Sequence, residues 1–418
     1  MPVHVARPRT REELVETIAA AAGAGRVVKV PGSGHSFTEA ALTDGLHIDI
    51  GALRGVLDAD PASGRVRVQA GIALRDLNQE LHRRGLAMAN LGDIDRQTIA
   101  GAISTATHGT GSRLQNISAQ VEAIELVTAD GQVHELTEQS DPDGFRAARV
   151  GIGALGAISA VTLRTVPAFL LHRVDAPLGL DEVLGDFEAL ADGNDHFEFY
   201  VFPYTEKALT IVRNRFDGPP RPRSALNVFV NEGIMQNVVG EWIFRLTRAR
   251  PALIPRVTGL ASGLLSEGDY IDHSFKIFSS ERKIRFTEME YAIPREHGPA
   301  AVRRVLEWIS SNRYPVAFPI ECRVVAPDDA LLSPVYERET FYIAVHQFRG
   351  MEWRPYFAAV EEIMGSYGGR PHWGKRHLLT HETLAQRYPR FGDFLAVRDR
   401  FDPRRAFANA NTRRVLGE

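Results

Sequence analysis

The sequence predicts a soluble α+β protein with more than one domain. The chain has 418 residues, which is longer than one ordinary domain. Its content of 44% hydrophobic and 24% charged residues is typical of a globular protein. Segments with strand character and segments with apolar residues at helical spacing follow one another along the chain. We therefore expect two or three domains.

The first 170 residues predict a compact α+β domain. Residues Thr10-Arg11-Glu12-Glu13 have the sequence of a capping box, and apolar residues at helical spacing follow them. A second helix carries Leu74, Leu77 and Leu81 on one stripe. Asp130-Gly131 is typical of a hairpin turn. Strands are expected at residues 27–30, 47–50, 65–69, 121–128, 133–136 and 157–166.

A second domain is expected over residues 171–385, where aromatic strands alternate with helices. The last segment, residues 386–418, contains the turn sequence Phe401-Asp402-Pro403 and is expected to pack back on the first domain. In the second domain, strands are expected at residues 196–202 and 341–346, and helices at residues 299–310 and 355–364.

Composition and charge exclude several classes of protein. The formal net charge of −3, with acids and bases mixed, gives no field that would attract nucleic acid. Cys322 is the sole cysteine, so neither an intramolecular disulfide nor a thiolate metal cluster can form. Residues 1–11 lack the apolar core of a signal peptide. Residues 252–265 are apolar but contain Arg256, and they favour a buried or loosely amphipathic helix over membrane contact. We expect a cytoplasmic protein without an integral membrane segment.

A glycine-rich loop, Pro31-Gly32-Ser33-Gly34-His35-Ser36, directly follows a predicted strand. Clustered glycines leave backbone N–H groups open to an anionic group, which is the logic of a phosphate cradle. The loop lacks the Lys-Ser/Thr pair of a nucleotide-triphosphate loop, so the sequence disfavours ATP hydrolysis. On spacing alone, an ordinary turn is an equal alternative.

A second segment, residues 101–111, has no bulky polar side chain except His108. Such a segment lets another molecule lie against the backbone. A flexible surface loop is the alternative, although Ile99 and Ile103 indicate partial burial.

The segment Gly151-Ile152-Gly153-Ala154-Leu155-Gly156 matches the dinucleotide fingerprint letter for letter. That fingerprint requires the order strand, turn, helix. Here helix-like sequence precedes the glycines and a strand follows them. We therefore reject a Rossmann NAD site.

Two segments of the expected second domain concentrate charge. Glu321 and Arg323 are two residues apart in an apolar strand and so share one face. They either line a site or form a structural ion pair at a sheet edge. The segment Arg370-Pro371-His372-Trp373-Gly374-Lys375 holds three possible donors and is either a surface turn or a site loop. Histidines at metal-ligand spacing with a carboxylate between them are absent from the sequence, so no metal is assigned.

Taken in order, four of these segments resemble one family. The loop at 31–37, the run at 107–111, the Glu321–Arg323 pair and the run at 372–375 resemble the aldonolactone and alditol oxidase branch of the vanillyl-alcohol oxidase flavoproteins. Residues 408–416 also match, so the resemblance covers essentially the whole chain. It implies a two-domain PCMH-type FAD-binding fold. The N-terminal part and the C-terminal tail would form the FAD domain, and a cap domain of sheet and helices would cover the flavin.

The resemblance also implies that FAD is joined covalently through His35, a link that raises the flavin's reduction potential and prevents its loss. Gly92 and Asp93 are implied beside the isoalloxazine ring, and Ile158 at the adenine end. The other implied cofactor-binding residues are Pro31, Gly32, Ser33, Gly34 and Ser36 in the first loop, and Thr98, Gly101, Ser104, Thr105 and His108 along the rest of the cofactor.

The implied chemistry is hydride transfer from a C–OH carbon to flavin N5, while the hydroxyl loses its proton. By the resemblance, Glu321, Arg323, His346 and Lys375 lie over the flavin. Lys375 and Arg323 are expected to stabilise developing negative charge, and Glu321 to hold substrate hydroxyls and orient Arg323. His346 is a candidate proton acceptor because imidazole titrates near neutrality, and a packed strand histidine is the alternative.

Two differences from the alditol-oxidising members favour a lactone substrate. Those members carry a short hydroxyl residue where this chain has His346 and a serine where it has Asp93. With the segments at 195–204 and 285–291, these differences favour a 1,4-lactone, such as L-gulono- or L-galactono-1,4-lactone, over a polyol such as xylitol or sorbitol. Gly92 permits oxygen as electron acceptor, and another redox carrier is the alternative. A flavin carrier or sensor without turnover is the alternative from another class, and the charged residues argue against it.

Overall fold

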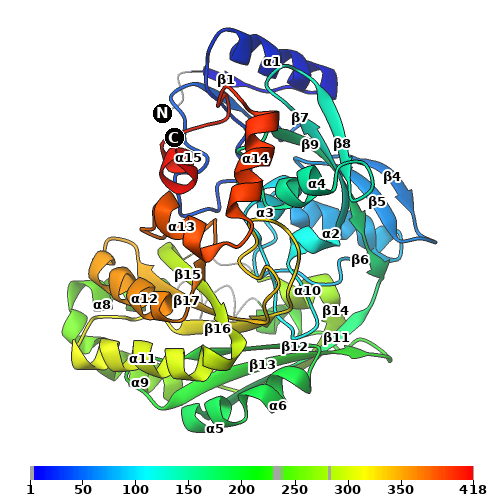
Figure 1. The fold of residues 1–418 in the computed structure, drawn as a ribbon. Helices are drawn as coiled ribbons and strands as arrows, with labels where there is room; N and C mark the ends of the chain where they lie inside the picture. Colours follow the sequence, from blue (N-terminus) through cyan, green and yellow to red (C-terminus); the bar gives the residue numbers. More distant parts are fainter. Residues whose placement is uncertain (1–3, 229–236, 238, 281–283, 418) are drawn as a thin grey trace.

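The chain folds into two parts that face each other, an upper and a lower one in Figure 1. The computed structural model describes residues 4–228, 237, 239–280 and 284–417. The two ends of the chain lie in the upper part, and the middle of the chain forms the lower part (Figure 1).

The upper part contains a five-stranded antiparallel sheet of order β4-β5-β9-β7-β8 and a three-stranded parallel sheet of order β1-β3-β2. A short pair, β6 with β10, lies apart from both sheets. The strands are β1 (His4–Ala6), β2 (Val28–Lys29), β3 (Leu46–Ile48), β4 (Val56–Asp60), β5 (Arg65–Gln69), β6 (Leu86–Ala87), β7 (Val121–Val127), β8 (Val133–Thr137), β9 (Ala157–Arg164) and β10 (Val166–Pro167). The helices are α1 (Arg11–Gly23), α2 (Leu74–Arg83), α3 (Ile99–Ser104), η1 (Ile117–Gln120) and α4 (Pro142–Arg149).

The lower part is an eight-stranded antiparallel sheet of order β14-β11-β13-β12-β16-β17-β15-β18. Helices α5, α6, α11 and α12 share one apolar core with it. The strands are β11 (Leu170–Gly179), β12 (His196–Val201), β13 (Lys207–Phe216), β14 (Gly268–His273), β15 (Phe286–Pro294), β16 (Ile320–Val325), β17 (Thr340–Phe348) and β18 (Arg370–Pro371). The helices are α5 (Leu180–Gly185), α6 (Phe187–Asp192), α7 (Ala225–Val228), α8 (Gly240–Ala249), η3 (Pro251–Leu253), α9 (Ile254–Gly263), α10 (Ser274–Phe278), η4 (Arg295–His297), α11 (Gly298–Ser311) and α12 (Arg354–Ser366).

Strand alternation gives the large sheet two different faces. On β16, Ile320, Cys322 and Val324 are fully buried against the helices. Because successive side chains of a strand point to opposite faces, Glu321 and Arg323 face the upper part instead. The same alternation on β12, β15 and β17 turns a further set of polar side chains towards the upper part. The interface between the two parts is therefore charged.

The end of the chain completes the core of the upper part. Helices α13 (His381–Arg387), α14 (Phe391–Phe401) and α15 (Ala410–Leu416) lie beside the N-terminal elements (Figure 1). Their apolar side chains, such as Phe394, belong to the same buried cluster as Leu14 and Val161. The Val28 N–H donates to the Ala406 carbonyl across 2.8 Å, next to the glycine-rich loop.

Most predicted elements are confirmed, and two differ in instructive ways. Thr10 caps α1 by accepting from the Glu13 N–H at 3.1 Å, but the Glu13 carboxylate accepts from the Arg9 N–H, so the capping box is not reciprocal. The strand predicted at 157–166 is divided into β9 and β10. At the break, Thr165 bonds the Gly64 carbonyl through both its N–H and its hydroxyl.

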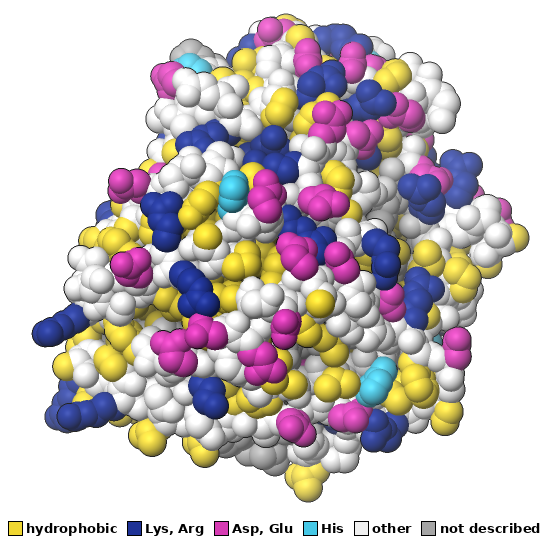
Figure 2. All heavy atoms as spheres, turned by 60° about the horizontal axis from the view of Figure 1, so that its bottom comes forward, with side chains coloured by type: hydrophobic (Ala, Val, Ile, Leu, Met, Phe, Trp, Pro, Cys, Tyr) yellow, Lys and Arg dark blue, Asp and Glu magenta, His cyan; other side chains and the backbone are white. Residues whose placement is uncertain are grey.

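The surface mixes charges of both signs on the face shown in Figure 2, in agreement with the small net charge. The apolar segment at 252–265 forms α9, on which Leu260 is 72% exposed and Leu264, just beyond its end, 82%. Ile254 and Thr258 are buried, so the segment is the loosely amphipathic helix that was one of the two predicted forms. Among the helices that the structure describes, none has both the length and the hydropathy needed to cross a bilayer.

We predict that Asn409→Ala destabilises the protein by about 2–3 kcal/mol, because a cap and several tertiary bonds are lost together. The Asn409 side chain accepts from the Thr412 N–H at 2.9 Å and donates to the carbonyls of Glu39, Ala40 and Leu42 at 2.8–3.0 Å. Denaturant unfolding measures the change. Thr10→Ala, which removes an exposed cap, is the control and should cost about 1 kcal/mol or less. Equal losses in the two variants would contradict this role of Asn409.

Candidate active site

Three cavities follow one another, the first within the upper part and the other two between the two parts. We call them the cradle, of about 110 Å³, the inner chamber, of about 80 Å³, and the outer chamber, of about 1020 Å³. Ser36 lines all three, Thr105 lines the cradle and the inner chamber, and His35 lines the inner and outer chambers. The glycine-rich loop therefore connects them.

Two glycines of the cradle lie so close to the Thr98 side chain that larger residues have little room there. A Cβ atom at Gly32 would stand 2.5 Å from the Thr98 Oγ1, and one at Gly101 would stand 3.1 Å from the same atom. Sequence-predicted residues that line the cradle are Pro31, Gly32, Ser36, Thr98, Gly101, Ser104, Thr105 and Ile158. Ser33 is exposed and lines none of the three cavities, while Gly34 lines the outer chamber.

Residues 151–156, which match the dinucleotide fingerprint in sequence only, form one wall of the cradle. Helix α4 precedes them and β9 follows them, which confirms the order that excluded a Rossmann site. Ile152, Gly153 and Gly156 have positive φ values of 45°, 66° and 158°. A Cβ atom at Gly156 would meet the Val127 carbonyl at 2.6 Å, so this glycine permits close packing on β7.

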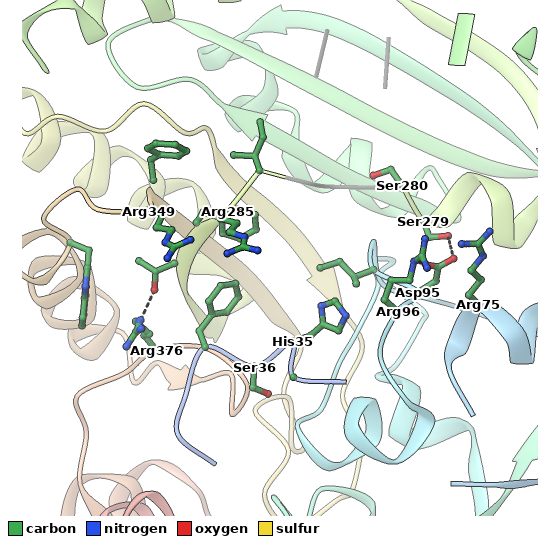
Figure 3. A pocket seen from close by; sticks show the side chains of 18 of the residues that line it. His35, Ser36, Arg75, Asp95, Arg96, Ser279, Ser280, Arg285, Arg349 and Arg376 are labelled. Carbon is green, nitrogen blue, oxygen red and sulfur yellow. Dashed lines mark hydrogen bonds and ion pairs between the residues drawn. The ribbon is translucent and has the colours of Figure 1, made fainter. Parts of the chain in front are cut away.

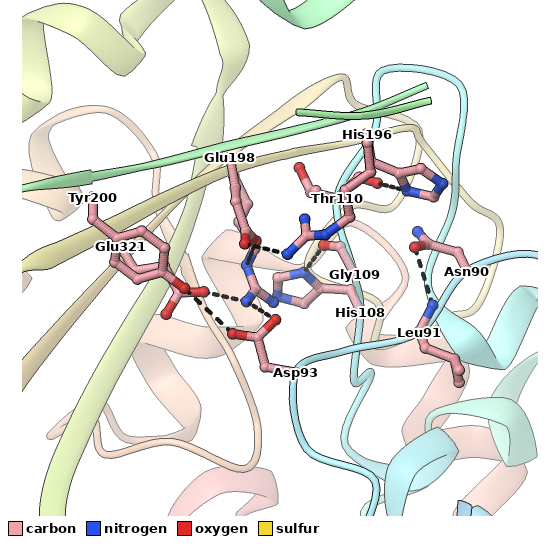
Figure 4. A network of polar contacts seen from close by, with 12 residues as sticks. Asn90, Leu91, Asp93, His108, Gly109, Thr110, His196, Glu198, Tyr200 and Glu321 are labelled. Atoms are coloured by element: carbon pink, nitrogen blue, oxygen red, sulfur yellow. Dashed lines mark hydrogen bonds and ion pairs between the residues drawn. The ribbon is translucent and has the colours of Figure 1, made fainter. Parts of the chain in front are cut away.

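The inner chamber contains a buried ion cluster around Arg323, whose carboxylate members Asp93, Glu198 and Glu321 lie close together in Figure 4. Arg323 contacts Asp93 at 2.6 Å and Glu198 at 3.0 Å, and it also pairs with Glu321. Although burial alone would lower it, these three carboxylates hold the pKa of Arg323 well above its ordinary value. Arg213 donates to the other oxygen of Glu198 at 2.7 Å. The guanidinium is therefore a fixed, permanently charged donor.

A second ion cluster surrounds Lys375, which follows β18 and contacts two carboxylates of β15. Its Nζ lies 2.5 Å from Glu288 Oε1 and 3.9 Å from Glu290 Oε2. Burial would lower the pKa of Lys375, but the two carboxylates raise it above its ordinary value. Burial would likewise raise the pKa of Glu288, yet Lys375 and His346 bring it down to about 2. Lys375 is consequently a charged donor and not a base.

Histidines complete the inner chamber. His108 Nε2 lies 3.2 Å from Glu290, and its ring stacks on Tyr342 at 3.8 Å. Burial lowers the pKa of His372 to about 3, so this ring is neutral. The Gly374 N–H donates to its Nδ1 at 3.0 Å, which leaves the proton on Nε2. His108, Glu290 and His372 bring their ligand atoms within 4.8 Å of one another, a spacing that could hold a metal ion.

His346 stands behind this layer. Its Nε2 lies 3.5 Å from Glu288, and its ring packs edge-on against Phe286 at 5.1 Å. Among the described residues that line the three cavities, His346 does not occur, whereas Glu321, Arg323 and Lys375 all line the inner chamber. The structure therefore brings three of the four proposed catalytic residues to one cavity.

Gly92, Asp93 and His108 also line the inner chamber. A Cβ atom at Gly92 would stand 3.0 Å from the His108 carbonyl oxygen, so the backbone at this position lies tightly against its neighbour. His35 is half-buried, and burial together with Arg96 and Lys375 lowers its pKa below the ordinary value. Its imidazole is therefore neutral at neutral pH.

The sequence analysis gave no site role to Glu198, Arg213, Glu288 and Glu290, and it placed His372 in a possible site loop without assigning it a role. Glu288 and Glu290 alternate with the buried Met289 and Tyr291 on β15. A charged residue at every second position of an apolar strand was the available signal.

Comparisons with known proteins agree with this geometry. Residues 161–415 match the D-arabinono-1,4-lactone oxidase family, and residues 2–137 match an FAD binding domain. The chain is 50% identical to L-gulono-1,4-lactone dehydrogenase of Mycobacterium tuberculosis, covering 100% of this chain and 96% of the relative. It is 35% identical to L-gulonolactone oxidase of Bos taurus, covering 98% and 94%. It is also 30% identical to alditol oxidase of Streptomyces sp., covering 99% and 95%.

Among solved structures, cholesterol oxidase from B. sterolicum superposes with a TM-score of 0.82 at 17% identity, covering 99% of this chain and 94% of that one. This similarity confirms the predicted fold, and the match of residues 2–137 identifies its FAD-binding part. From the sequence matches, the chain belongs to the D-arabinono-1,4-lactone oxidase family of FAD-dependent oxidoreductases.

Proposed function

We propose that the protein oxidises a sugar 1,4-lactone, of the L-gulono-1,4-lactone type, with FAD held in the cradle and the inner chamber. The observation that carries this proposal is the convergence of Lys375, Arg323 and Glu321 on an enclosed chamber that opens into the cradle. FAD, when bound, accepts the hydride, and the protein supplies position and charge.

The cradle fits the extended part of such a cofactor. Its glycines Gly32 and Gly101 present backbone without side chains to the cavity, and Ile158 offers an apolar surface at the far end. The inner chamber adjoins the cradle at Ser36 and Thr105, so a single elongated molecule can occupy both. The ring system would then lie beside Gly92, Asp93 and His108.

A covalent link through His35 is part of this proposal. A neutral imidazole has a free lone pair, and the lowered pKa of His35 keeps that form populated at neutral pH. Its position between the inner and outer chambers would place the link at the outer edge of the flavin.

The charged residues then have distinct tasks. Lys375 and Arg323, both held in the charged form, would stabilise the negative charge that develops on the substrate oxygen and on the reduced flavin. Glu321 would accept from substrate hydroxyls and orient Arg323. His346 reaches the chamber through Glu288, so we assign it as a positioning residue for Glu288 and Lys375.

The charge of the inner chamber favours a neutral polyhydroxy substrate. Asp93, Glu288, Glu290 and Glu321 line it, against Arg323 and Lys375. A lactone carries no charge, whereas its hydrolysed aldonate would meet these carboxylates. An open-chain polyol is also neutral, and the 30% identity to an alditol oxidase keeps polyol oxidation as the second candidate. Oxygen or another redox carrier would receive the electrons.

The first prediction of this proposal concerns the substrate class. Under nitrogen, L-gulono-1,4-lactone should bleach the flavin band, while xylitol at equal concentration should bleach it at least about tenfold more slowly, since each missing favourable contact weakens transition-state binding by at least that factor. Bleaching by xylitol alone would favour the alditol oxidase, and a flavin that stays oxidised with both compounds would favour a carrier without turnover.

The second prediction concerns the tether. Acid-precipitated protein should remain yellow, and His35→Ala should release the flavin into the supernatant. Because the pKa of His35 is lowered, tethering of added FAD to apoprotein should decline only at pH values clearly below 6.5. His381→Ala, at a half-buried histidine outside the three cavities, should keep its colour. Free FAD released from the unmutated protein would disprove the link.

The third prediction concerns Lys375. Lys375→Ala should lower the rate constant of flavin reduction about 100-fold or more, and weaken lactone binding less than about tenfold, because the charge acts mainly in the transition state. Stopped-flow reduction separates the two effects. Lys375→Arg keeps the charge and controls for misfolding from unpaired Glu288, and Lys207→Ala is the surface control. A comparable loss in the Lys207 variant would remove the basis for this role.

A further inference from the structure

The outer chamber is lined by basic side chains. Arg75, Arg96, Lys276, Arg285, Arg349 and Arg376 line it, against Asp95 as the single acidic residue among the described lining residues. The chain as a whole has a net charge of −3, and the face in Figure 2 mixes both signs. The positive lining is therefore a local feature of this cavity.

Two of these arginines oppose each other directly. Phe286 of β15 pairs with Phe348 of β17, so Arg285 and Arg349 are the next residues of the two strands, and the Arg349 N–H donates to the Arg285 carbonyl at 3.2 Å. Their side chains lie side by side at the cavity wall in Figure 3. Like charges directly opposite each other on antiparallel strands are destabilising. Among the described residues, no carboxylate lies within 4.0 Å of either guanidinium.

The other walls extend the same charge. Arg376 donates to the Thr287 hydroxyl and lies over the Trp353 ring at 4.7 Å, so its guanidinium is held at the cavity. Arg75 and Arg96 stand across the cavity from Arg285, with His35 between the two walls (Figure 3). Fixed cations on several sides of one concave space concentrate anions in it.

We propose that the outer chamber binds a small oxidant carrying two or more negative charges, and that this oxidant takes electrons from the reduced flavin at its His35 edge. The volume of about 1020 Å³ suits a small molecule and not a protein. The acceptor role rests on the proposed flavin at His35, whereas anion binding in the chamber does not.

The inner chamber explains why such an anion stays outside. Its carboxylates Asp93, Glu288, Glu290 and Glu321 repel a multivalent anion, while a neutral lactone passes. The basic lining of the outer chamber and the carboxylate-rich lining of the inner chamber would thus keep the oxidant and the substrate apart. In the redox step, a one-electron anionic oxidant acts twice: two electrons leave the reduced flavin, one proton is released to solvent, and two oxidant ions are each reduced by one electron.

Binding and electron transfer are tested with two trianions of the same shape. Hexacyanocobaltate(III) is inert to reduction, and its binding is measured by titration calorimetry. Ferricyanide is the oxidant, and its reaction is followed in stopped flow with flavin that has been photoreduced without any lactone. Ferrocenium, a cation, reoxidises the same reduced protein as reference. The variant is Arg285→Glu/Arg349→Glu, and the matched control is Arg26→Glu/Arg54→Glu, at exposed arginines outside the three cavities.

We expect hexacyanocobaltate to bind the unmutated protein and the control, and to bind the variant at least about tenfold more weakly. The ratio of the ferricyanide rate to the ferrocenium rate should fall at least about tenfold in the variant, and should fall with added salt in the unmutated protein. Lack of hexacyanocobaltate binding to the unmutated protein would overturn the anion site. An unchanged rate ratio in the variant, despite weakened binding, would overturn the acceptor role. Failure of lactone to bleach the flavin would count against the proposed function alone.

Discussion

The alternation of side chains on the eight-stranded sheet is the constraint on which the site depends. One face must be apolar to pack on α11 and α12, so the charged residues of β12, β15 and β16 all project from the other face. Buried charges are costly unless they are paired. The upper part supplies Asp93 and His108 to this network, and neither part alone can satisfy it. Charge pairing therefore sets how the two parts meet.

The same network fixes the protonation states on which the chemistry depends. Arg323 and Lys375 are surrounded by carboxylates, which keep both cations charged despite burial. The pKa of His372 is lowered instead, because burial is the largest influence on this ring, and the ring is therefore neutral. Fixed donors in a buried site need little reorganisation when charge develops, and this is the main advantage of such a site.

Local sequence patterns predicted the elements well, since β5 and the capped α1 depend on nearby residues. The glycine-rich loop and the Glu321–Arg323 pair were also visible, because each has a short-range signature. The partners of those residues could not be identified from the sequence. Glu198 and Glu288 become site residues only when distant strands pair, and strand order is a property of the tertiary fold. For the same reason, the position of His346 behind Glu288 could not be read from its strand.

The role of the final helices in the upper core has a consequence for biogenesis. Phe394 and Val415 belong to a cluster that comes mainly from residues 14–171, and Asn409 holds the backbone at residues 39–42. Residues 391–416 are synthesised long after residues 14–171, so the N-terminal part cannot reach its final packing when it first leaves the ribosome. Cofactor loading would accordingly wait until residues 391–416 have been made and have packed in place.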